Sequence, residues 1–464
     1  MHPAAQGRIP AAEIDARTRI ILEAPLLRTI IRLAVPNAAV MVTQVSLGLI
    51  ELYFLAKLGV DALAGVSQVF PLVSLVGAIS QGAIGGGVLS AVARRLGKTE
   101  RSEADETVWY AIAIAVAMGA LTSATILCGG PAYYTAMGAR GASLDAAITY
   151  SNLVFAFAVL TWLFNLLLAV VRGTGNLVLP LAIVCGGASV AATAMPILIF
   201  GWGPVPAFGL IGGALAMIGY YATGSVCLLL FLFGHRGALR PGPMPPRFRF
   251  QRFWEILRIG GMAALVSSTT NLTLGAMTGF VASHGTAAVA GYGAGARLEF
   301  LLTYLSYGIG GPGTIVIGTN IGAGKRSRAL QASWIAVLGA ALLCETVGVC
   351  GALWPEAWLR LFTTDPNALA VGSQYLRTVG PFFGFFGVGY AMYCAGQGMA
   401  RMGWPVAGAL VRTVIAVAGG AFAAAQFQEP VWIFAAASAG MLAFALASIG
   451  GLAPRRLQSN SSGI

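Results

Sequence analysis

The stretch LVLPLAIVCGGASVAATAMPILIFG, residues 177–201, contains no Asp, Glu, Lys or Arg. A helix needs about 20 consecutive apolar residues to cross the hydrocarbon core of a bilayer, so this stretch predicts a transmembrane helix. Eleven further stretches are similarly apolar, at residues 28–54, 63–93, 106–130, 145–171, 207–234, 253–283, 288–322, 329–353, 369–400, 404–425 and 429–453. The sequence therefore predicts an all-α polytopic membrane protein with twelve transmembrane helices.

The composition of the whole chain agrees with this interpretation. Of the 464 residues, 57% are hydrophobic and 9% are charged, and the mean hydropathy is +0.80. Soluble domains carry roughly 25% charged residues, so this chain has too few charges to cover a surface that faces water. The net charge of +12 comes mainly from Lys and Arg in short loops. This pattern indicates orientation by the positive-inside rule and argues against nucleic acid as a partner.

The longest polar stretch inside the chain, residues 235–252, divides the predicted helices into two sets of six. We interpret it as a cytoplasmic linker between an N-terminal lobe, residues 28–234, and a C-terminal lobe, residues 253–453. A cytoplasmic arm, residues 1–27, and a cytoplasmic tail, residues 454–464, flank the lobes. Most of the 28 Lys and Arg residues lie on the side of the N-terminus, including Arg172 in a predicted loop. The positive-inside rule therefore predicts that both termini are cytoplasmic. We expect the protein in the inner membrane.

The two halves of the sequence resemble each other. Residues 58–65, LGVDALAG, follow the first predicted helix, and residues 284–291, HGTAAVAG, follow the seventh, with an offset of 226. Residues 83–87, AIGGG, match residues 308–312, GIGGP, with an offset of 225. Six helices in each half mean that both halves enter the membrane from the same side. The pattern predicts a parallel repeat, as in transporters whose two halves move about a central site.

Several segments resemble the multidrug and toxic compound extrusion (MATE) family. They include LAVP at residues 33–36, ELYFLAKLG at 51–59, RGTG at 172–175, AGYG at 290–293 with Arg297 and Glu299, and AGQG at 395–398. The resemblance covers about residues 28–450. It implies a secondary antiporter that uses an inward Na⁺ or H⁺ gradient to expel organic cations, drugs or other xenobiotics by alternating access. It also implies that the protein is not an enzyme and acts as a monomer on small organic substrates among membrane lipids.

The sequence departs from this family at several positions that often carry acidic residues. The seventh predicted helix has Ser and Thr residues and no acid, and the tenth has Gly384 and Gly387 in its apolar centre. On the fifth helix, Met195 and Ala191 stand where one branch of the family has an Asp and an Asn. These departures leave few carboxyl groups inside the predicted membrane region.

Glu51 is the leading candidate for ion coupling, because it lies inside the first predicted helix and matches a position where the family usually has an Asp. A carboxyl in a low-dielectric cavity holds a proton more readily than in water, and substrate can compete for it. The alternative is a hydrated glutamate at the helix end. Gln44 lies two turns earlier on the same face and is a candidate ligand for substrate or for the carboxyl, and the alternative is a packing hydrogen bond to another helix. Pro36 is a candidate hinge beside this site, because proline breaks helical hydrogen bonds.

Glu299 is the best coupling candidate in the C-terminal half. Arg297 lies on the same predicted helix, but residues two apart point in different directions, so we expect each to find another partner across the lobe. Such a structural network is favoured over a direct coupling role. Glu345 matches no family segment, and we expect a structural or interfacial acid there.

A drug-binding cavity should be apolar and aromatic with few polar groups, because such a surface accepts varied compounds. The candidates are Phe155, Trp162, Phe164 and Asn165 on the fourth predicted helix, and Ser267 and Thr270 on the seventh. For any one of these residues, ordinary packing is the favoured alternative.

The sequence contains no phosphate-binding loop of the G-x-x-x-x-G-K-[ST] type, so ATP does not drive transport within this chain. We expect no cofactor, no metal site and no catalytic residue. The coupling ion is predicted to be H⁺ rather than Na⁺, because a proton needs one titratable group whereas Na⁺ needs several oxygen ligands. The rival function is a flippase for lipid-linked glycans. Such proteins often line their cavity with Lys and Arg, whereas only Arg297 and Arg412 are predicted inside helices.

Overall fold

The computed structural model describes residues 15–234 and 236–450. Most of the predicted N-terminal arm, the first residue of the linker and the predicted tail lie outside this part. A short helix, α1 (Ala16–Glu23), begins at Asp15, whose carboxylate accepts a hydrogen bond from the backbone N–H of Arg17 at 3.1 Å. Such a side-chain cap satisfies one of the free N–H groups of the first turn.

The N-terminal lobe contains six spanning units, each of which begins and ends within several residues of its predicted range. The units are α2 (Leu26–Ala56), α3 (Val60–Gly77) with η2 (Ala78–Ile84) and α4 (Gly85–Gly97), α5 (Arg101–Ala136), α6 (Ala142–Ala156) with α7 (Ala158–Gly173), α8 (Val178–Phe200) and α9 (Leu210–Phe233).

The C-terminal lobe repeats this organisation after the linker. Its helices are α10 (Phe250–Ala282), α11 (Thr286–Gly322), α12 (Arg326–Leu353), the short α13 (Pro355–Leu359), α14 (Pro366–Val379) with η3 (Gly380–Phe382) and α15 (Phe383–Met399), α16 (Gly403–Gln426) and α17 (Val431–Ile449). The prediction of twelve transmembrane helices in two bundles is confirmed.

Within the described residues, nine spans meet the length and apolarity of a transmembrane helix, and the bent pair α6–α7 brings the number to ten. The two remaining units differ for physical reasons. The Ser, Thr and Asn side chains of residues 267–273 make α10 less apolar, and α14 and α15 are each shorter than a full span and are joined by η3.

The breaks follow the repeat. The bend of 50° between α6 and α7 falls at Phe157, and η3 ends at Phe382. These positions differ by 225, the offset that relates the two halves of the sequence. Each lobe therefore breaks its fourth helix at the same place.

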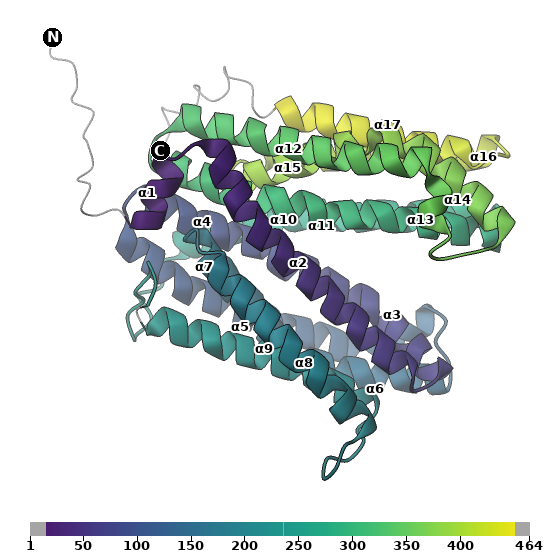
Figure 1. Ribbon diagram of the computed structural model, residues 1–464, viewed down its shortest axis with the longest axis horizontal. Helices are drawn as coiled ribbons and strands as arrows, with labels where there is room; N and C mark the ends of the chain where they lie inside the picture. Colours follow the sequence, from purple (N-terminus) through teal and green to yellow (C-terminus); the bar gives the residue numbers. More distant parts are fainter. Residues whose placement is uncertain (1–14, 235, 451–464) are drawn as a thin grey trace.

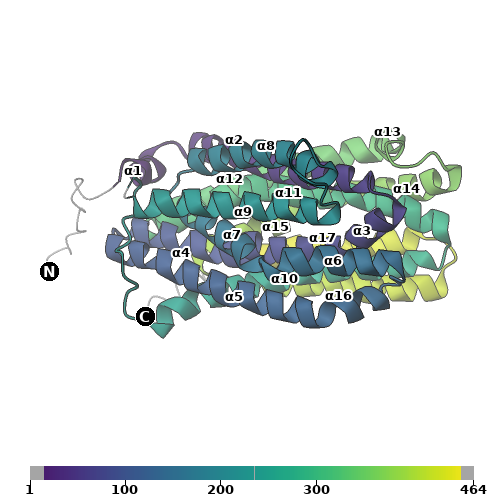
Figure 2. The ribbon, with the colours of Figure 1, turned by 90° about the horizontal axis from the view of Figure 1, so that it is seen from below.

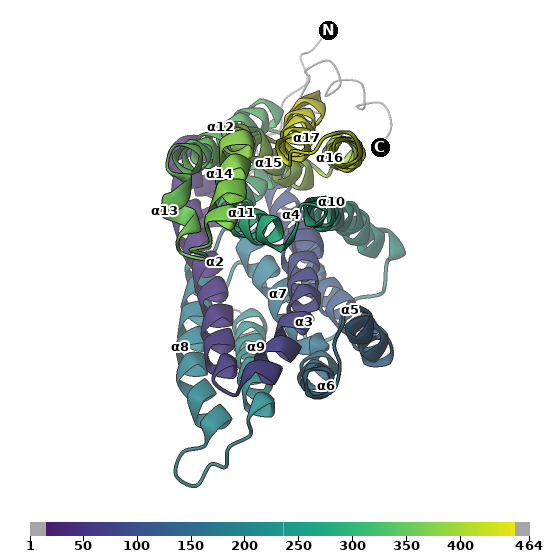
Figure 3. The ribbon, with the colours of Figure 1, turned by 90° about the vertical axis from the view of Figure 1, so that its right-hand side faces the viewer.

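The two lobes form separate bundles that meet toward one end (Figure 1). The view along the molecule shows α2–α9 in one group and α10–α17 in the other (Figure 3), and the long helices run side by side along the longest axis (Figure 2). Contacts between the lobes join α2, η2 and α4 to α10 and α11. We call the end where α1 and α4 lie, at the left of Figure 1, the basic end, because the arginines near residues 94–101 and 325–328 lie there.

At the basic end, α4 and α11 cross so closely that their backbones touch. A Cβ added at Gly97 would overlap the carbonyl oxygen of Thr319, and a Cβ added at Gly322 would overlap that of Arg94. Both pairs are related by the offset of 225, so the crossing is symmetric between the two lobes. Small residues permit this approach, as in other membrane helix pairs.

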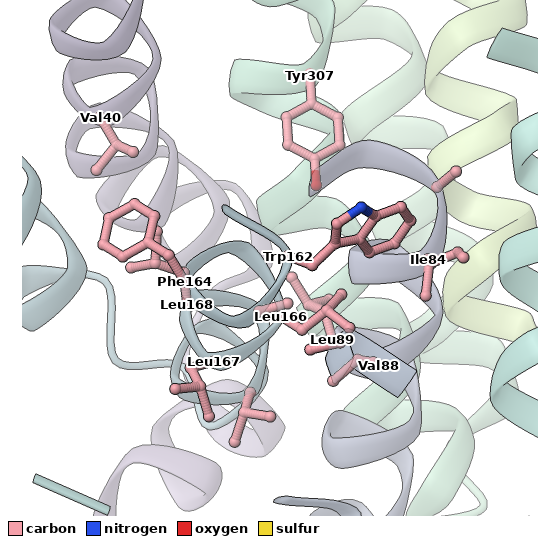
Figure 4. Close-up of a cluster of buried hydrophobic side chains, with 14 of the residues drawn as sticks. Val40, Ile84, Val88, Leu89, Trp162, Phe164, Leu166, Leu167, Leu168 and Tyr307 are labelled. Atoms are coloured by element: carbon pink, nitrogen blue, oxygen red, sulfur yellow. The ribbon is translucent and has the colours of Figure 1, made fainter. Parts of the chain in front are cut away.

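The largest hydrophobic cluster surrounds α7, whose second half is buried on every side. Figure 4 shows Trp162 and Leu166 of α7 beside Val88 and Leu89 of α4, with Tyr307 of α11 directed toward the same region. The core of the N-terminal lobe thus reaches the interface with the other lobe.

Candidate coupling and substrate sites

In the N-terminal lobe, α2 places Glu51 against Tyr150 of α6. The Glu51 side chain is 8% exposed, and the Tyr150 hydroxyl donates a hydrogen bond of 2.6 Å to Oε1 of the carboxyl group. Within the described part of the chain, no Lys, Arg or His forms an ion pair with Glu51. The predicted coupling carboxyl is therefore buried, with a neutral hydrogen-bond donor beside it.

In the C-terminal lobe, Glu299 of α11 has a cationic partner. Nη2 of Arg412 in α16 lies 2.7 Å from Oε1 of Glu299, and the Tyr375 hydroxyl donates to Oε2 at 2.9 Å. The Arg412 guanidinium also contacts Thr270 Oγ1 at 3.3 Å and lies over the Phe386 ring. Glu299 is thus held in a buried ion pair.

Arg297 does not pair with Glu299. Its guanidinium lies over the ring of Phe362, with the carbon Cζ 4.7 Å from the ring centroid. The expectation that Arg297 and Glu299 each find another partner in the lobe is confirmed.

Tyr150 and Tyr375 occupy equivalent positions of the repeat, because their numbers differ by 225. Each donates to a buried glutamate, but the glutamates come from different helices: α2 in the first lobe and α11 in the second. Sequence reasoning missed both tyrosines. The repeat offset would have paired them, although nothing in the sequence shows that a carboxyl group lies opposite.

Gln44 faces a glutamine and not the carboxyl of Glu51. Its Oε1 accepts a hydrogen bond of 2.7 Å from Nε2 of Gln81 in η2. Pro36 lies inside the continuous helix α2, and the fifteen residues to Glu51 correspond to about 22 Å of helix. The placement of Pro36 beside the coupling site is therefore wrong, although its role as a hinge stays a prediction.

The candidate cavity residues of the fourth predicted helix lie in the packed interior of the N-terminal lobe. Phe155, Trp162 and Phe164 are each at most 2% exposed. The Trp162 indole donates to Thr122 Oγ1 of α5 at 3.1 Å, and Asn165 Nδ2 donates to Ser80 Oγ of η2 at 2.9 Å. These contacts connect α7 to its neighbours, and a substrate-binding role for these residues stays a prediction.

The candidates on α10 are half-buried. The Ser267 hydroxyl donates to the carbonyl of Ala263 at 3.4 Å in its own helix. The Thr270 hydroxyl donates to the carbonyl of Val266 at 3.0 Å and accepts from Arg412. Of the two, Thr270 belongs to the polar cluster around Glu299.

Glu345 of α12 stabilises the break in the tenth span. Its Oε2 accepts a hydrogen bond of 2.8 Å from the backbone N–H of Gly384, in the first turn of α15. The free N–H groups and the helix dipole favour a negative charge at this place. The expectation that Glu345 is a structural acid agrees with this contact.

The basic end carries a cluster of ion pairs that sequence reasoning did not predict. Glu255 of α10 lies 2.7 Å from Arg94 and 3.2 Å from Arg95, both of α4. Arg252, also of α10, lies 2.6 Å from Glu103 of α5 and also pairs with Glu106. These pairs join the lobes. Their signal in the sequence is the alternation of acidic and basic residues at the ends of neighbouring predicted helices.

The N-terminal helix α1 also crosses to the other lobe at this end. Lys325 Nζ donates to the carbonyl of Leu22 at 3.2 Å, and Arg328 donates to the carbonyls of Ala24 and Ile21. Cations are favourable at the C-terminus of a helix, where carbonyl groups lack partners within the helix. The linker also packs at the basic end, where the backbone N–H of Arg249 donates to the Tyr110 hydroxyl at 3.0 Å.

Arg172 corrects the sequence interpretation in one respect. It was predicted in a loop, but it lies in the last turn of α7 and is 1% exposed. The glycines that follow it, in residues 173–175, suggested a turn from residue 172, but the helix continues to Gly173 and the turn begins two residues later, at Thr174. The N-terminal lobe therefore contains a buried guanidinium that sequence reasoning missed.

The fold and these polar groups define a two-lobed membrane transport protein: two repeated bundles joined at one end, with separate buried carboxyl groups. The MatE family model matches residues 36–198 and 263–422, which is more than half of the chain. The chain therefore belongs to the MatE family, the multidrug and toxic compound extrusion transporters, and it is a transporter and not an enzyme. The family predicted from the sequence is confirmed.

Two relatives match most of the chain. One is an FAD transporter of Shewanella oneidensis, 26% identical over 79% of this chain and 81% of the relative. Another is a probable multidrug resistance protein, NorM, of Thermotoga maritima, 26% identical over 81% of each chain. An outward-facing structure of a multidrug resistance MATE family transporter matches with a TM-score of 0.84 at 21% identity, over 96% of this chain and 98% of that one. This structural likeness shows the fold.

Proposed function

We propose that the protein is a secondary antiporter that exports small organic compounds across the inner membrane in exchange for protons. Its relatives include a transporter of FAD and a probable multidrug resistance protein, which supports small organic cargo such as drugs or other xenobiotics. The parallel repeat supports alternating access, in which the two lobes open in turn on either side of the membrane.

We place the basic end in the cytoplasm. Lys and Arg are enriched in the cytoplasmic loops of membrane proteins, and the described arginines and lysines gather at this end. Hydrogen bonds also cross between the lobes toward this end, for example from Ser90 to the carbonyl of Gln397 and from Arg94 to Glu255. In this assignment the structure is closed toward the cytoplasm, and both ends of the chain are cytoplasmic.

The coupling group is Glu51, and the observation that carries this proposal is its burial without a cationic partner among the residues that the structure describes. A buried charge is costly unless an opposite charge or several hydrogen bonds compensate it. Tyr150 supplies one hydrogen bond, so a proton is the simplest compensation when water cannot reach the carboxyl group. Opening of the lobes or arrival of substrate would then release this proton.

Glu299, the other predicted coupling residue, is less suited to this role. It would have to lose or share its contact with Arg412 before it could exchange a proton freely. A sodium-coupled cycle would need more oxygen ligands than the glutamate and tyrosine at Glu51 provide. No observation favours the flippase, because Arg297 and Arg412 are already engaged by Phe362 and Glu299.

The test uses the purified protein in liposomes loaded with a fluorescent cation, rhodamine 123, with a pH gradient or a Na⁺ gradient imposed separately. We expect the pH gradient to drive transport in the native chain and not in the Glu51→Gln variant. Glu356→Gln is the matched control, because it makes the same change at an exposed carboxyl group. Glu356 lies in α13 and pairs with Arg360, the residue that follows this helix. Transport driven by Na⁺ at equal pH, or normal pH-driven transport in Glu51→Gln, would refute the proposal.

A further inference from the structure

The guanidinium of Arg172 is enclosed by protein, yet none of its three nitrogen atoms has a hydrogen-bond partner among the described residues. No carboxylate among the described residues forms an ion pair with it. A guanidinium has five N–H donors and carries its charge at every physiological pH. Arg172 differs in this respect from Arg94, Arg95 and Arg412, which are also buried and each have an anionic partner.

The repeat explains why Arg172 has no acceptor. Its equivalent in the C-terminal lobe is Gln397, because 172 and 397 differ by 225. Nε2 of Gln397 crosses the lobe interface and donates to the carbonyls of Gly82 at 2.9 Å and Ala83 at 3.5 Å. Symmetry would direct Arg172 to the equivalent carbonyls of α11, those of residues 307 and 308.

Those two carbonyls are already occupied by a donor from another helix. Nδ2 of Asn37 in α2 donates to the carbonyl of Tyr307 at 3.2 Å and to that of Gly308 at 3.3 Å. The Tyr307 side chain is nevertheless directed toward α7, the helix that carries Arg172, so α7 lies against the C-terminal lobe (Figure 4). Asn37 thus takes the hydrogen bonds to these carbonyls of α11, and the Arg172 guanidinium remains free to bind another group.

An unpaired buried cation is unfavourable by several kcal/mol, and an uncharged glutamine at the equivalent place avoids that cost. Stability of the closed state therefore does not explain an arginine here. If the lobes separate at the basic end, α11 would move away with Tyr307, and the guanidinium would then face the space between the lobes. A planar fork of donors suits a carboxylate or a phosphate group, which can accept two parallel hydrogen bonds.

We propose that Arg172 binds the acidic group, carboxylate or phosphate, of organic cargo that enters from the basic end. The proposal rests on the proposed function, because it requires that the lobes open at this end. It predicts that, among the organic compounds that the protein transports, those that carry an acidic group bind more tightly than their uncharged or esterified counterparts, whether or not they also carry a positive charge. Arg172 would hold that group by charge-assisted hydrogen bonds while the rest of the cargo lies between the lobes.

The experiment measures binding to the full-length protein with two pairs of fluorescent probes that differ in one group. Riboflavin 5′-phosphate is compared with riboflavin, and rhodamine 110, which has a free carboxyl group, with its methyl ester rhodamine 123. The variants are Arg172→Gln, which introduces the residue of the equivalent position, and Arg172→Lys, which retains the charge without the fork. Arg297→Gln is the control, because it makes the same change at an exposed arginine of a helix, whose guanidinium lies over the Phe362 ring within the C-terminal lobe.

We expect the native protein to prefer the acidic member of at least one pair by about tenfold or more, the effect of one or two hydrogen bonds to a charged group. The preference should disappear in Arg172→Gln, remain in part in Arg172→Lys and persist in Arg297→Gln. Binding of the uncharged or esterified member should not change in Arg172→Gln, which shows that the variant is folded. The thermal midpoint of Arg172→Gln should be equal to or above that of the native chain.

The proposal would be overturned if the native protein did not prefer the acidic member of either pair, or if the preference survived in Arg172→Gln. It would also be overturned if inorganic phosphate alone raised the thermal midpoint of the native protein as much as the acidic probes do. The last result would indicate a site for small anions and not for cargo. Binding is measured without a gradient, so these outcomes are independent of proton coupling. If the native chain did not transport rhodamine 123 in response to a pH gradient, that result would instead refute the proposed function.

Discussion

The two lobes are alike where they touch and different where they bury polar groups. At the basic end each lobe presents a glycine, Gly97 or Gly322, to the backbone of the other, at equivalent positions of the repeat. Among the described residues, Glu51 has a tyrosine and no cation as partner, whereas Glu299 has an equivalent tyrosine and Arg412 as well. The contact between α4 and α11 at the basic end, which we call the closing surface, therefore retains the symmetry of the repeat. The buried polar groups inside the two lobes do not.

This difference assigns separate tasks to the two buried acids. An ionised glutamate with a fixed cation is a structural element, because either charge becomes very unfavourable when its partner leaves. A glutamate without a cation can gain or lose a proton at a smaller structural cost. The asymmetry therefore concentrates proton exchange in the N-terminal lobe, and each prediction below tests one part of it.

The largest expected effect is on stability, in the variant Arg412→Ala. It leaves Glu299 buried without its cation, and breaking a buried ion pair in this way costs about 3–5 kcal/mol of the free energy of unfolding. The variant Glu51→Gln should cost about 1 kcal/mol or less, because it alters one hydrogen bond. Thermal unfolding of the purified protein measures both.

A double variant separates a charge effect from a packing effect. Arg412→Met combined with Glu299→Gln removes both charges and keeps similar volumes, so we expect it to recover most of the stability lost in Arg412→Ala. Equal stability of Arg412→Ala and Glu51→Gln would contradict the comparison, since it would mean that Glu299 does not depend on its cation.

The next effect concerns the symmetric crossing of α4 and α11. A methyl group at Gly97 or at Gly322 meets a backbone carbonyl of the other lobe, and overpacking of this kind costs about 1–3 kcal/mol. Because this cost falls on the state that is closed at the basic end, we expect Gly97→Ala and Gly322→Ala to slow transport by similar factors of about tenfold.

Transport in liposomes and thermal stability are compared for the same variants, with Gly48→Ala as control because its added methyl group meets open space. The two lobes should keep their individual stability, since the contact lies between them. A strong effect in one variant and none in the other would show that the closing surface is not symmetric.

The helices were predictable from the sequence because each needs a long apolar run, and among the described spans only α10 and α14–α15 do not meet the length and apolarity of a transmembrane helix. The partners of Glu51 and Glu299 were not predictable, since they depend on which helix faces meet. Tyr150 in an apolar run resembles an ordinary packing residue until a carboxyl group lies 2.6 Å from its hydroxyl. Arg172 was placed in a loop because glycines follow it, and its burial is a property of the folded lobes.

The two tyrosines give a finer comparison of the acids. A hydrogen bond to a charged group contributes about 1.5–3 kcal/mol and one between neutral groups about 0.5–1.5 kcal/mol. If Glu299 is ionised and Glu51 is protonated, Tyr375→Phe should destabilise the protein more than Tyr150→Phe. Unfolding midpoints of both variants test this order, and Tyr53→Phe, at an exposed tyrosine of α2, serves as the control. The reverse order would place the charge in the N-terminal lobe.

The smallest effect concerns the ion pairs at the basic end, which the repeat does not duplicate: Thr319 and Asn320 are the equivalents of Arg94 and Arg95. Glu255 is 41% exposed in its side chain, so water and salt screen it, and partly exposed pairs contribute about 0.2–1 kcal/mol. In Glu255→Gln, the lobes should therefore separate at the basic end only slightly more often. We expect the labelling rate of a thiol introduced by Ser90→Cys to rise by about two- to fivefold.

Ser90 suits this measurement because it is fully buried and donates to the carbonyl of Gln397 across the interface. A maleimide reaches that position only when the lobes separate, provided that the native cysteines are first replaced. Glu356→Gln removes an ion pair of similar length within one lobe and should leave the rate unchanged. High salt should abolish the difference, since it screens the pairs already in the native protein. If Glu255→Gln instead opened the interface as strongly as Gly97→Ala, the charges and not the symmetric glycine crossing would hold the lobes together.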